Sequence, residues 1–474
     1  MVSRQSTSLV AAGAFLSLFF SACSTYPERA AKIRDACGNQ DYATAVELAK
    51  QEAENANEND RLQWQLDYAT TLWLQQDFRT ASGAWDDALK TFEYWDEKAD
   101  TLISKEISAG LSNLSALPYR GQDIDRIMLH TYRALTYLEL GDIAAARPAL
   151  NAAYREQTLA VERNAKEIEK AKDESQKEEV DQKTLAEQND KINKKLEEEQ
   201  KNDFQFEHYA DYVNPFTTWL YGIYFLHAAA DSGDIERSRN ALERVNQMVP
   251  GNPVVKADLD LIAGGRKLSQ PVTYIIYEYG KIANLREWRL DLILPDPITG
   301  STAPFAIALP RINCPRLDPK TSHANNYEIP YMKANDCEAA LVCDMNRVRV
   351  TEFHNKYPSI VMRTLTTAII KTTSAIAVNT AARKSNSLAF QVFSLIGTSV
   401  YTLGSAGADL RVWQTLPRSF SIARIPTPEN KKITVSVAGR ELEIDVPDAK
   451  VSVIYVNAES YMRAPRASAF VLKK

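Results

Sequence analysis

The first half of the chain carries the hydrophobic spacing of amphipathic helices. From Tyr26 to about Leu261, apolar residues mostly recur three or four positions apart, which places them on one face of a helix. Within this region a single pattern recurs: a turn, then Asp, then an apolar or aromatic residue, then a helix. Its four occurrences are GNQDYATAVELA, LQQDFRTASGAWDDAL, ELGDIAAARPALNAA and DSGDIERSRNALERV.

This pattern resembles the turn between the two helices of a tetratricopeptide (TPR) repeat. Gln40 and Gln76, the turn positions of the first two units, are 36 residues apart, close to the TPR period of about 34. In the third unit Gly141 ends one helix and Asp142 caps the next. The resemblance implies a solenoid whose concave face binds peptides or proteins. The alternative is a generic helical bundle in which Gly-Asp turns merely cap helices.

Residues 151–214, between the third and fourth units, form a charged insertion without Gly or Pro. Pairs such as Glu162 with Lys166 and Glu187 with Lys191 stand four apart, in the order that supports an isolated helix. Apolar positions are too sparse for a long two-stranded coiled coil. We predict a protruding helical hairpin with a break near residues 173–181, and a solvated, partly disordered linker is the alternative.

The run NPFTTWLYGIYFLHAAA that follows is too short and too polar at its flanks to demand a membrane span. We predict a buried core helix. His227 within it is interpreted as a packed histidine and not a ligand.

The second half changes to β-branched and aromatic runs, and we place the domain boundary near residue 268. Ala438-Gly439 is typical of a hairpin tip. The predicted fold is α+β and multidomain, with an all-α TPR-like domain over 23–267 and a β-rich domain over 268–474. Candidate strands are VTYIIYEYG, LREWRLDLIL, PFAIAL, EAALVCD, SFSIARI, ITVSV, ELEIDV and VSVIYV.

Residues 352–408 interrupt the β-rich half with a helical segment rich in small residues. Ser385 to Ala408 contains no charge in 24 residues, yet Ser, Thr and Gln occur throughout. Because a lipid-facing span would expose those polar groups at high cost, we predict two amphipathic helices, broken near 384–387 and packed on the sheet. In the alternative, the hairpin contacts a membrane or a second copy, with Gly397 and Gly404 allowing close helix packing.

The N-terminus has the features of an export signal: Arg4, an apolar run from Leu9 to Phe20, and small residues before Cys23. Phe20-Ser21-Ala22-Cys23 resembles the bacterial lipobox, in which the cysteine is diacylated and becomes the new N-terminus. The resemblance implies a signal peptide over 1–22 and stable attachment to a membrane. Ser24, in place of Asp, implies the outer membrane, with the periplasmic side favoured over the cell surface. The alternative is an ordinary signal peptidase site.

Four further cysteines remain, and an oxidising periplasm would allow them to pair. Cys337 and Cys343 are expected on one strand, about 20 Å apart, too far for a bridge. We favour a disulfide between Cys314 and Cys337, which would close the Pro- and Asn-rich loop between them. Four free thiols, including Cys37, are the alternative.

Two segments, YIIYEYGKIANLREWRLDLILP and AGADLRVWQTLP, resemble a family of poorly characterised Gram-negative lipoproteins. The family combines a TPR-like N-terminal half with a β-containing C-terminal half, and the matching positions are Asp409, Arg411, Trp413 and Pro417. The resemblance supplies no activity. Asp409 and Arg411 are expected to form a structural ion pair in preference to a binding site.

Catalytic and metal-binding motifs are missing from the sequence. The five histidines form no metal-ligand spacing, and no phosphate-binding loop, dinucleotide fingerprint or nucleophile elbow occurs. A net charge of −5 offers no basic surface for nucleic acid. We therefore expect no enzyme activity, no cofactor and no nucleic-acid partner.

These features predict a lipid-anchored scaffold that faces the periplasm and binds envelope proteins through its TPR-like surface. The second hypothesis is an oligomeric or membrane-inserting structural component of an envelope assembly or secretion complex. Peptidoglycan or glycan binding is a lesser alternative.

Overall fold

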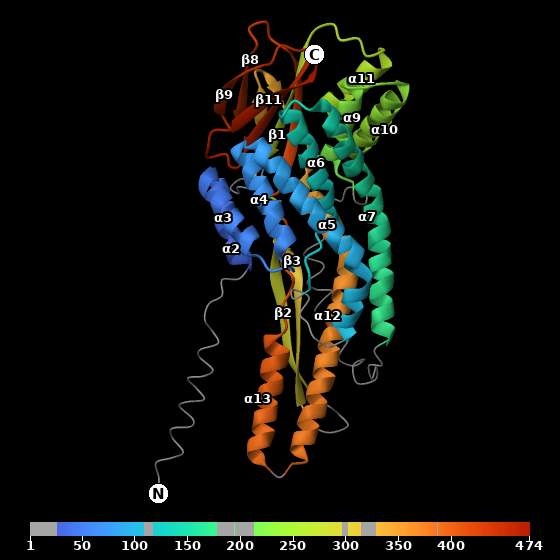
Figure 1. Ribbon diagram of the computed structural model, residues 1–474, viewed down its shortest axis with the longest axis vertical. Coiled ribbons are helices and arrows are strands. Elements are labelled where there is room, and N and C mark those ends of the chain that lie inside the picture. The colour runs from blue at the N-terminus through green and yellow to red at the C-terminus, as the bar shows by residue number, and fades with distance from the viewer. Residues whose placement is uncertain are drawn as a thin grey trace.

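Figure 1 shows the computed structural model, an elongated molecule with a broad body and a narrow arm. The structure describes residues 26–108, 117–177, 194, 213–295, 302–313, 329–385 and 387–474. Helices from the first half cover one side of the body, and strands from the second half form its other layers. The predicted α+β class, with TPR-like helices first and strands second, is confirmed.

Consecutive helices of the first half pack as antiparallel pairs. Most turns between the two helices of a pair are short, as the repeat pattern predicts. The helices are α2 (Tyr26–Gly38), α3 (Tyr42–Asn55), α4 (Arg61–Gln75), α5 (Phe78–Ser108), α6 (Asp123–Glu139), α7 (Ile143–Lys177), α9 (Pro215–His227), α10 (Ser232–Met248) and α11 (Pro253–Ala263).

The turns within the first three pairs share one geometry. Gln40, Gln76 and Gly141 have positive φ angles of 59°, 68° and 77°, the left-handed conformation that ends a helix. The Asp that follows each of them accepts a hydrogen bond from the backbone N–H three residues later, as predicted. These caps join Asp41 to Thr44 (3.2 Å), Asp77 to Thr80 (3.1 Å) and Asp142 to Ala145 (2.9 Å).

The fourth pair differs. Its cap is Asp231, which accepts from the N–H of Asp234, so our placement of the capping Asp at 234 was wrong. Asp234 is fully buried and pairs with Arg147 of the preceding repeat at 2.5 Å. The sequence DSGD offers two carboxylates, and the tertiary contact with Arg147 decides between them.

The charged insertion is described only in part. Helix α7 continues without a break through Lys177, well into the segment 151–214. Apart from Lys194 and residues 213 and 214, the rest of the insertion lies outside the described residues, and so does the return half of the predicted hairpin.

The strands of the second half form three sheets. Sheet A has the order β11-β10-β1-β7-β6, in which β1 is parallel to β10 and the other pairs are antiparallel. Sheet C has the order β5-β4-β8-β9, and β2 and β3 form a separate ribbon. The strands are β1 (Val272–Tyr279), β2 (Asn284–Pro295), β3 (Thr302–Asn313), β4 (Met332–Ala334), β5 (Cys337–Glu338), β6 (Ala340–Asp344), β7 (Ser419–Pro426), β8 (Lys432–Val437), β9 (Arg440–Asp445), β10 (Val451–Ala458) and β11 (Arg466–Lys473).

Most predicted strands are present, with three differences. The segment expected as one strand, EAALVCD, is divided between β5 in sheet C and β6 in sheet A. Strands β4 and β11 were not predicted. The hairpin tip at Ala438-Gly439 is confirmed, with positive φ at both residues.

Sheet A is buried on both faces, which explains the unbroken apolar runs of its central strands. Tyr274 and Ile276 of β1 face the helices, whereas Ile275 and Tyr277 face sheet C. The body therefore has three layers: helices, sheet A and sheet C. The core between the first two layers is continuous, so the helical and β halves share it.

The helical interruption of the β-rich half projects from the body. Helix α12 (Met345–Arg383) follows β6 directly and begins ahead of residue 352, where we placed the start of the insertion, because Asp344 caps it. Helix α13 (Leu388–Gly404) returns after a break at the predicted position. Both helices pack against the β2–β3 ribbon, and only the start of α12 contacts sheet A. We call β2, β3, α13 and residues 357–383 of α12 the arm.

Trp413 lies where the two halves meet. Its ring is fully buried, with the rings of Trp85 and Tyr132 at centroid distances of 5.7 and 6.0 Å. Its indole N–H donates to the hydroxyl of Thr70 in α4 at 2.9 Å. One side chain of the C-terminal half therefore contacts three helices of the N-terminal half.

We expect Trp413→Ala to lower the free energy of unfolding by about 3 to 5 kcal/mol, because it leaves a large cavity in the shared core. Urea denaturation followed by far-UV and near-UV circular dichroism measures the change. The two signals should move together, since both halves lose the same contact. Tyr331→Ala, at an exposed site, is the control and should change stability by less than about 0.5 kcal/mol. Separate transitions for the two signals would contradict a shared core.

Candidate interaction surfaces

The inner face of the helical array is covered by the chain itself. Helices α4, α6 and α9 are the first members of their pairs, and nearly all of their residues are buried. Sheet A and the segment 411–417 pack against them. This is the face on which a TPR array holds peptides. Our expectation that it is open to a partner is wrong for this structure, because the C-terminal half occupies it.

Asp67 of α4 shows how closely the two halves fit. Its Oδ1 accepts hydrogen bonds from the backbone N–H and the hydroxyl of Thr415, at 3.2 and 2.8 Å. Its Oδ2 has no hydrogen-bond partner among the described residues. Burial raises the pKa of Asp67 to about 7, despite the hydrogen bonds from Thr415 that lower it. The contact is specific, and it destabilises the folded protein once the carboxyl ionises.

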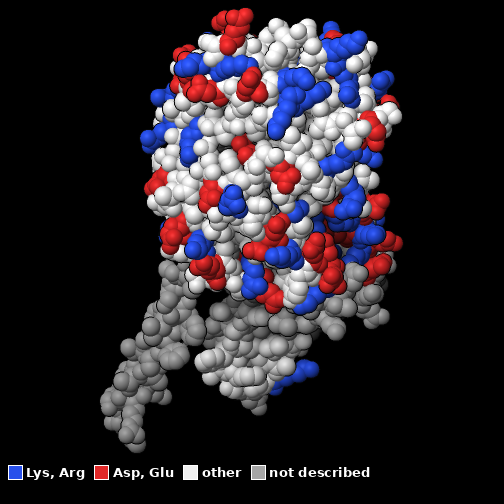
Figure 2. All heavy atoms as spheres, turned by 45° about the horizontal axis from the view of Figure 1, so that its top comes forward, with Lys and Arg blue, Asp and Glu red and all other residues white. Residues whose placement is uncertain are grey.

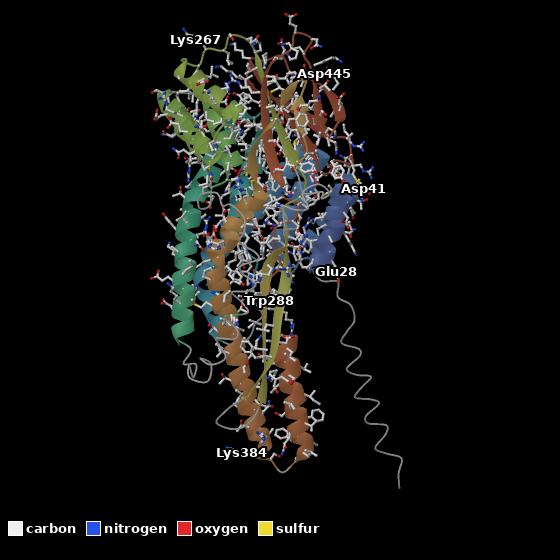
Figure 3. All side chains as sticks on the ribbon, turned by 180° about the vertical axis from the view of Figure 1, so that it is seen from behind. Glu28, Asp41, Lys267, Trp288, Lys384 and Asp445 are labelled. Carbon is white, nitrogen blue, oxygen red and sulfur yellow. The ribbon has the colours of Figure 1, made fainter. Side chains whose placement is uncertain are left out.

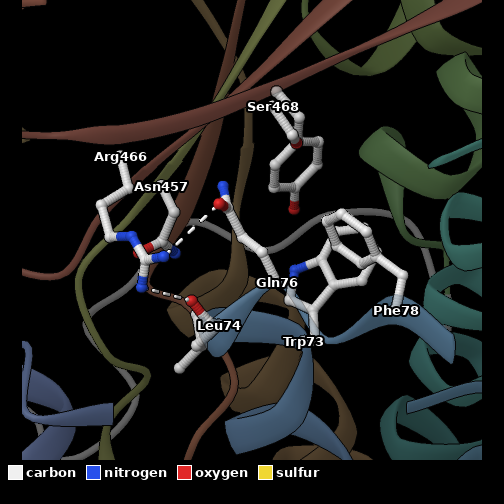
Figure 4. Close-up of a pocket in the computed structure, with 8 residues that line it drawn as sticks. Trp73, Leu74, Gln76, Phe78, Asn457, Arg466 and Ser468 are labelled. Carbon is white, nitrogen blue, oxygen red and sulfur yellow. Dashed lines mark hydrogen bonds between the residues drawn. The ribbon is translucent and has the colours of Figure 1, made fainter. Parts of the chain in front are cut away.

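A small cavity remains between α4 and sheet A (Figure 4). Its volume is about 10 Å³, room for one water molecule and no larger ligand. Arg466 crosses it and donates to the backbone oxygen of Leu74 at 3.2 Å and to the side chain of Gln76 at 3.4 Å. The cavity is therefore part of the contact between the two halves.

Of the four positions that resemble the lipoprotein family, Arg411, Trp413 and Pro417 are buried and Asp409 is partly exposed. Arg411 is 5% exposed and pairs with Asp409 at 2.8 Å and with Asp60, just before α4, at 2.9 Å. Burial alone would lower the pKa of Arg411, but the hydrogen bonds and charges of the two carboxylates raise it. Trp413 and Pro417 are buried beside it. The predicted ion pair is present and holds the segment against the helices.

Three cysteines lie among the described residues, and none of them is in a disulfide there. Cys37 and Cys343 are buried, and burial raises the pKa of the Cys37 thiol to about 12. Cys337 is partly exposed, and its predicted partner Cys314 lies outside the described residues, so that disulfide stays a prediction. Cys23 also lies outside them.

His227 is packed in the core, as predicted. The ring is 6% exposed, and its Nε2 is 3.0 Å from the hydroxyl of Tyr274 in β1. Burial lowers the pKa of His227 to about 3, so the ring is neutral at physiological pH. Among the described residues, no group of His, Cys, Asp and Glu is placed to hold a metal ion.

A larger hollow lies on the outer side of the helices. Its volume is about 300 Å³, and its wall combines aromatic and charged side chains of α5 with residues near the start of α4. The hydroxyl of Tyr94 is hydrogen-bonded to Glu58 and Lys98. The lining residues are Glu58, Arg61, Lys90, Thr91, Tyr94 and Trp95.

The arm carries the most unusual surface of the described structure. Eight large apolar side chains of α13 are exposed to solvent, and Leu388, Phe393 and Val400 are 75%, 78% and 63% exposed. Ile293 of β2 adds a further apolar side chain at 75%. The eight are Leu388, Phe390, Val392, Phe393, Leu395, Ile396, Val400 and Tyr401. A contiguous apolar surface of this kind marks an interaction site.

The inner side of α13 is polar. Ser394 is buried against α12 and donates to the side-chain oxygen of Asn379 at 2.7 Å, and Thr398 donates to the same oxygen at 3.2 Å. Nearer the body, Lys371 of α12 donates to the hydroxyl of Ser405 at 2.8 Å. Polar side chains thus join the two helices, and apolar ones face outward. This is the reverse of a helix in a water-soluble protein.

The far end of the arm is charged. Arg383 and Lys384 are exposed where α12 ends, and Lys384 lies at the tip in Figure 3. In Figure 2 the visible surface of the arm is white except for a blue group at its end, whereas both charge signs are mixed over the body. An apolar band therefore lies between the charged body and a basic tip.

The first turns of α12 hold the arm to the body. The carboxylate of Glu352 accepts from the N–H groups of Asp123 and Ile124, which caps the start of α6. Lys356 pairs with Asp123 and Glu352, each at 2.9 Å. Arg349 donates to the backbone oxygens of Ala283 and Trp413. These buried contacts fix the direction in which α12 leaves the body.

Among the described residues, no helix combines the length and the apolar composition that a membrane crossing requires.

Comparison with known proteins adds little to this description. No family model and no curated protein matches the chain. One similar solved structure is described as nearly identical TPR-like repeats of a kinesin light chain from Podosopora anserina. It is 15% identical, covers 51% of this chain and 96% of its own, and superposes with a TM-score of 0.21. A likeness at this level carries no argument.

We expect Asp67→Asn to gain stability relative to the natural protein as the pH rises from about 4 to 7. The pKa of Asp67 is about 7 in the folded protein and about 3.9 in an unfolded chain. Between these values the unfolded state releases its proton first, so ionisation progressively destabilises the natural protein. Asparagine cannot ionise and escapes this loss, which is on the order of 1.4 kcal/mol per unit of pKa difference.

Urea denaturation at pH 4.5, 6 and 7.5 measures this difference. Asp445→Asn removes the same charge from an exposed strand position and is the control. A difference between Asp67→Asn and the natural protein that stays constant over this pH range would contradict the raised pKa.

Proposed function

We propose that the protein is a lipid-anchored, non-catalytic component of the bacterial envelope. Its TPR-like body serves as a scaffold for envelope proteins, and its arm is a second contact surface. The single observation that carries the proposal is the exposed apolar face of α13 on an arm that projects from a closed body. Exposed apolar surface of this extent is stabilised only when something covers it.

The lipobox-like sequence supports the anchor. Cys23 precedes Tyr26, where α2 begins, by three residues, and three residues span about 10 Å at most. A lipid on Cys23 would therefore hold the start of α2 next to the membrane. Figure 3 shows Glu28, near that start, on the side of the body from which the arm extends, with Asp41 farther away. We propose an outer-membrane location with the body in the periplasm.

We place the partner-binding surface of the scaffold on the outer face of the helices and not on the inner face. The inner face is covered by the C-terminal half, whereas α3, α5 and α10 keep exposed outer faces. The hollow beside Tyr94 and Trp95 lies on this outer side. Aromatic side chains next to opposite charges suit a peptide segment of a partner protein.

We expect the natural chain to incorporate a palmitate analogue in Gram-negative cells and Cys23→Ala to lose the label completely, because the thiol is the only site the lipobox offers. Ser24→Asp is the matched control. It should keep the label but fractionate with the inner membrane, as the sorting residue of the lipoprotein family implies. Labelling of Cys23→Ala would refute the lipid anchor.

We also expect a photo-crosslinking amino acid at Lys90, on the wall of the outer hollow, to capture a reproducible envelope protein in cells. Mass spectrometry of the adduct identifies the partner. The same amino acid at Asp445, on the exposed edge strand β9, is the control and should capture none. Without a reproducible adduct at Lys90, the scaffold role would have to be abandoned.

A further inference from the structure

The geometry points to a lipid bilayer as the surface that covers the arm. We propose that α13 embeds its apolar side chains in the acyl-chain region of the membrane that holds Cys23. This inference rests on the proposed function and names the ligand of the arm. Three observations support it: the reversed polarity of the arm, the width of its apolar face, and the position of the basic tip.

Reversed polarity is the first argument. Ser394 and Thr398 turn inward to Asn379, and Phe393 and Ile396 turn outward. In water this arrangement exposes apolar surface and buries hydroxyl groups that water would solvate. In hydrocarbon the same arrangement is favourable, because polar groups need hydrogen-bond partners inside the protein and apolar groups need none. The contact between α12 and α13 therefore has the polar interior and apolar exterior expected in lipid, whereas the contact between α12 and the β2–β3 ribbon is apolar.

The width of the apolar face separates a bilayer from a protein partner. Projected at 100° per residue, the eight exposed apolar side chains of α13 cover about 240° of the helix circumference. The four inward polar residues, Gln391, Ser394, Thr398 and Thr402, cover about 80°. A second helix would cover only a narrow stripe of such a surface. Lipid chains surround a helix on every side that the protein leaves open.

The charges at the two ends of the arm match a membrane interface. The band from Leu388 to Tyr401 is about 20 Å long at 1.5 Å per residue, shorter than the hydrocarbon core of about 30 Å. A slanted arm can keep this band among the acyl chains. Lys384 then extends its flexible side chain to the phosphate groups. At the other end of the band, Arg289 and Asp291 of β2 lie beside the end of α13 and remain in water.

The anchor and the arm reach the same membrane. The start of α2 lies on the arm side of the body, and the arm extends beyond it in the same direction (Figure 3). A membrane close enough to hold lipidated Cys23 therefore lies in the path of α13. On the face of the body drawn in Figure 2, positive and negative side chains are mixed.

Flotation of the full mature chain, prepared from Ser24 onward so that it has no lipid, tests the inference. The probe is a vesicle of phosphatidylethanolamine and phosphatidylglycerol in a three-to-one ratio. We expect the chain to float with these vesicles and the double variant Phe393→Glu, Ile396→Glu to lose more than about tenfold in partitioning, because buried acidic groups are costly in hydrocarbon. Both side chains are exposed, so circular dichroism should show the variant folded.

Tyr331→Glu with Met462→Glu is the matched control, because it places two acids at exposed apolar positions of the body. It should float like the unaltered mature chain. A mature chain that stays with the soluble fraction as a dimer, and that Phe393→Glu, Ile396→Glu disperses, would overturn the inference and assign the face to a second copy. A soluble monomer would also overturn it. Palmitate labelling of Cys23 does not depend on either result. The experiments can therefore refute membrane contact by α13 and lipidation of Cys23 separately.

Discussion

The packing of the helical array onto sheet A determines what every other surface of the molecule can do. A chain of aromatic contacts crosses this interface, from Tyr455 in β10 through Trp73 and Tyr132 to Trp413. Because side chains of this size bury large areas, the two halves gain a core that neither would have alone. The same contact removes the concave helical face from use. The array of TPR-like pairs packs on sheet A through its inner face, and the proposed binding surfaces therefore lie elsewhere.

The body and the contact between α12 and α13 follow opposite rules of polarity. In the body, apolar side chains fill the interior, and buried charges such as Asp123 and Lys356 form ion pairs. In the arm, hydroxyl and amide groups lie between the helices, and Phe393 and Val400 face outward. A single folded chain is stable with both arrangements only if its two parts have different surroundings. The change occurs along α12, whose first turns are clamped in the body and whose last turns end at the tip.

Sequence patterns predicted most of the elements but not their long-range contacts. Turn chemistry located the caps at Asp41, Asp77 and Asp142, because each depends on neighbours three residues away. Strand β11 was missed, although Phe470 and Leu472 alternate with residues that face sheet C, since a short run at the chain end has little periodicity to detect. Occupation of the inner helical face was not predictable. It requires Trp413 to meet Thr70, more than 300 positions earlier, and no local pattern encodes that pairing.

Composition alone did not place the polar residues of the uncharged segment that forms α13. We took its Ser, Thr and Gln residues as an argument against contact with lipid, because a bilayer would not tolerate them if they were exposed. The structure places Gln391, Ser394, Thr398 and Thr402 on one inward stripe, where Asn379 accepts hydrogen bonds from Ser394 and Thr398, so most of this cost is avoided. Ser399 projects among the outward apolar residues. A diacylated cysteine already binds a membrane stably, and the arm is therefore not needed for affinity. In the proposal, a lipid on Cys23 attaches the body at one point and leaves it free to rotate, and a second contact through the arm removes that freedom. In this proposal, the contacts of Glu352, Lys356 and Arg349 at the start of α12 hold the arm at a fixed angle to the body. When α13 enters the membrane, the scaffold is therefore held in one orientation.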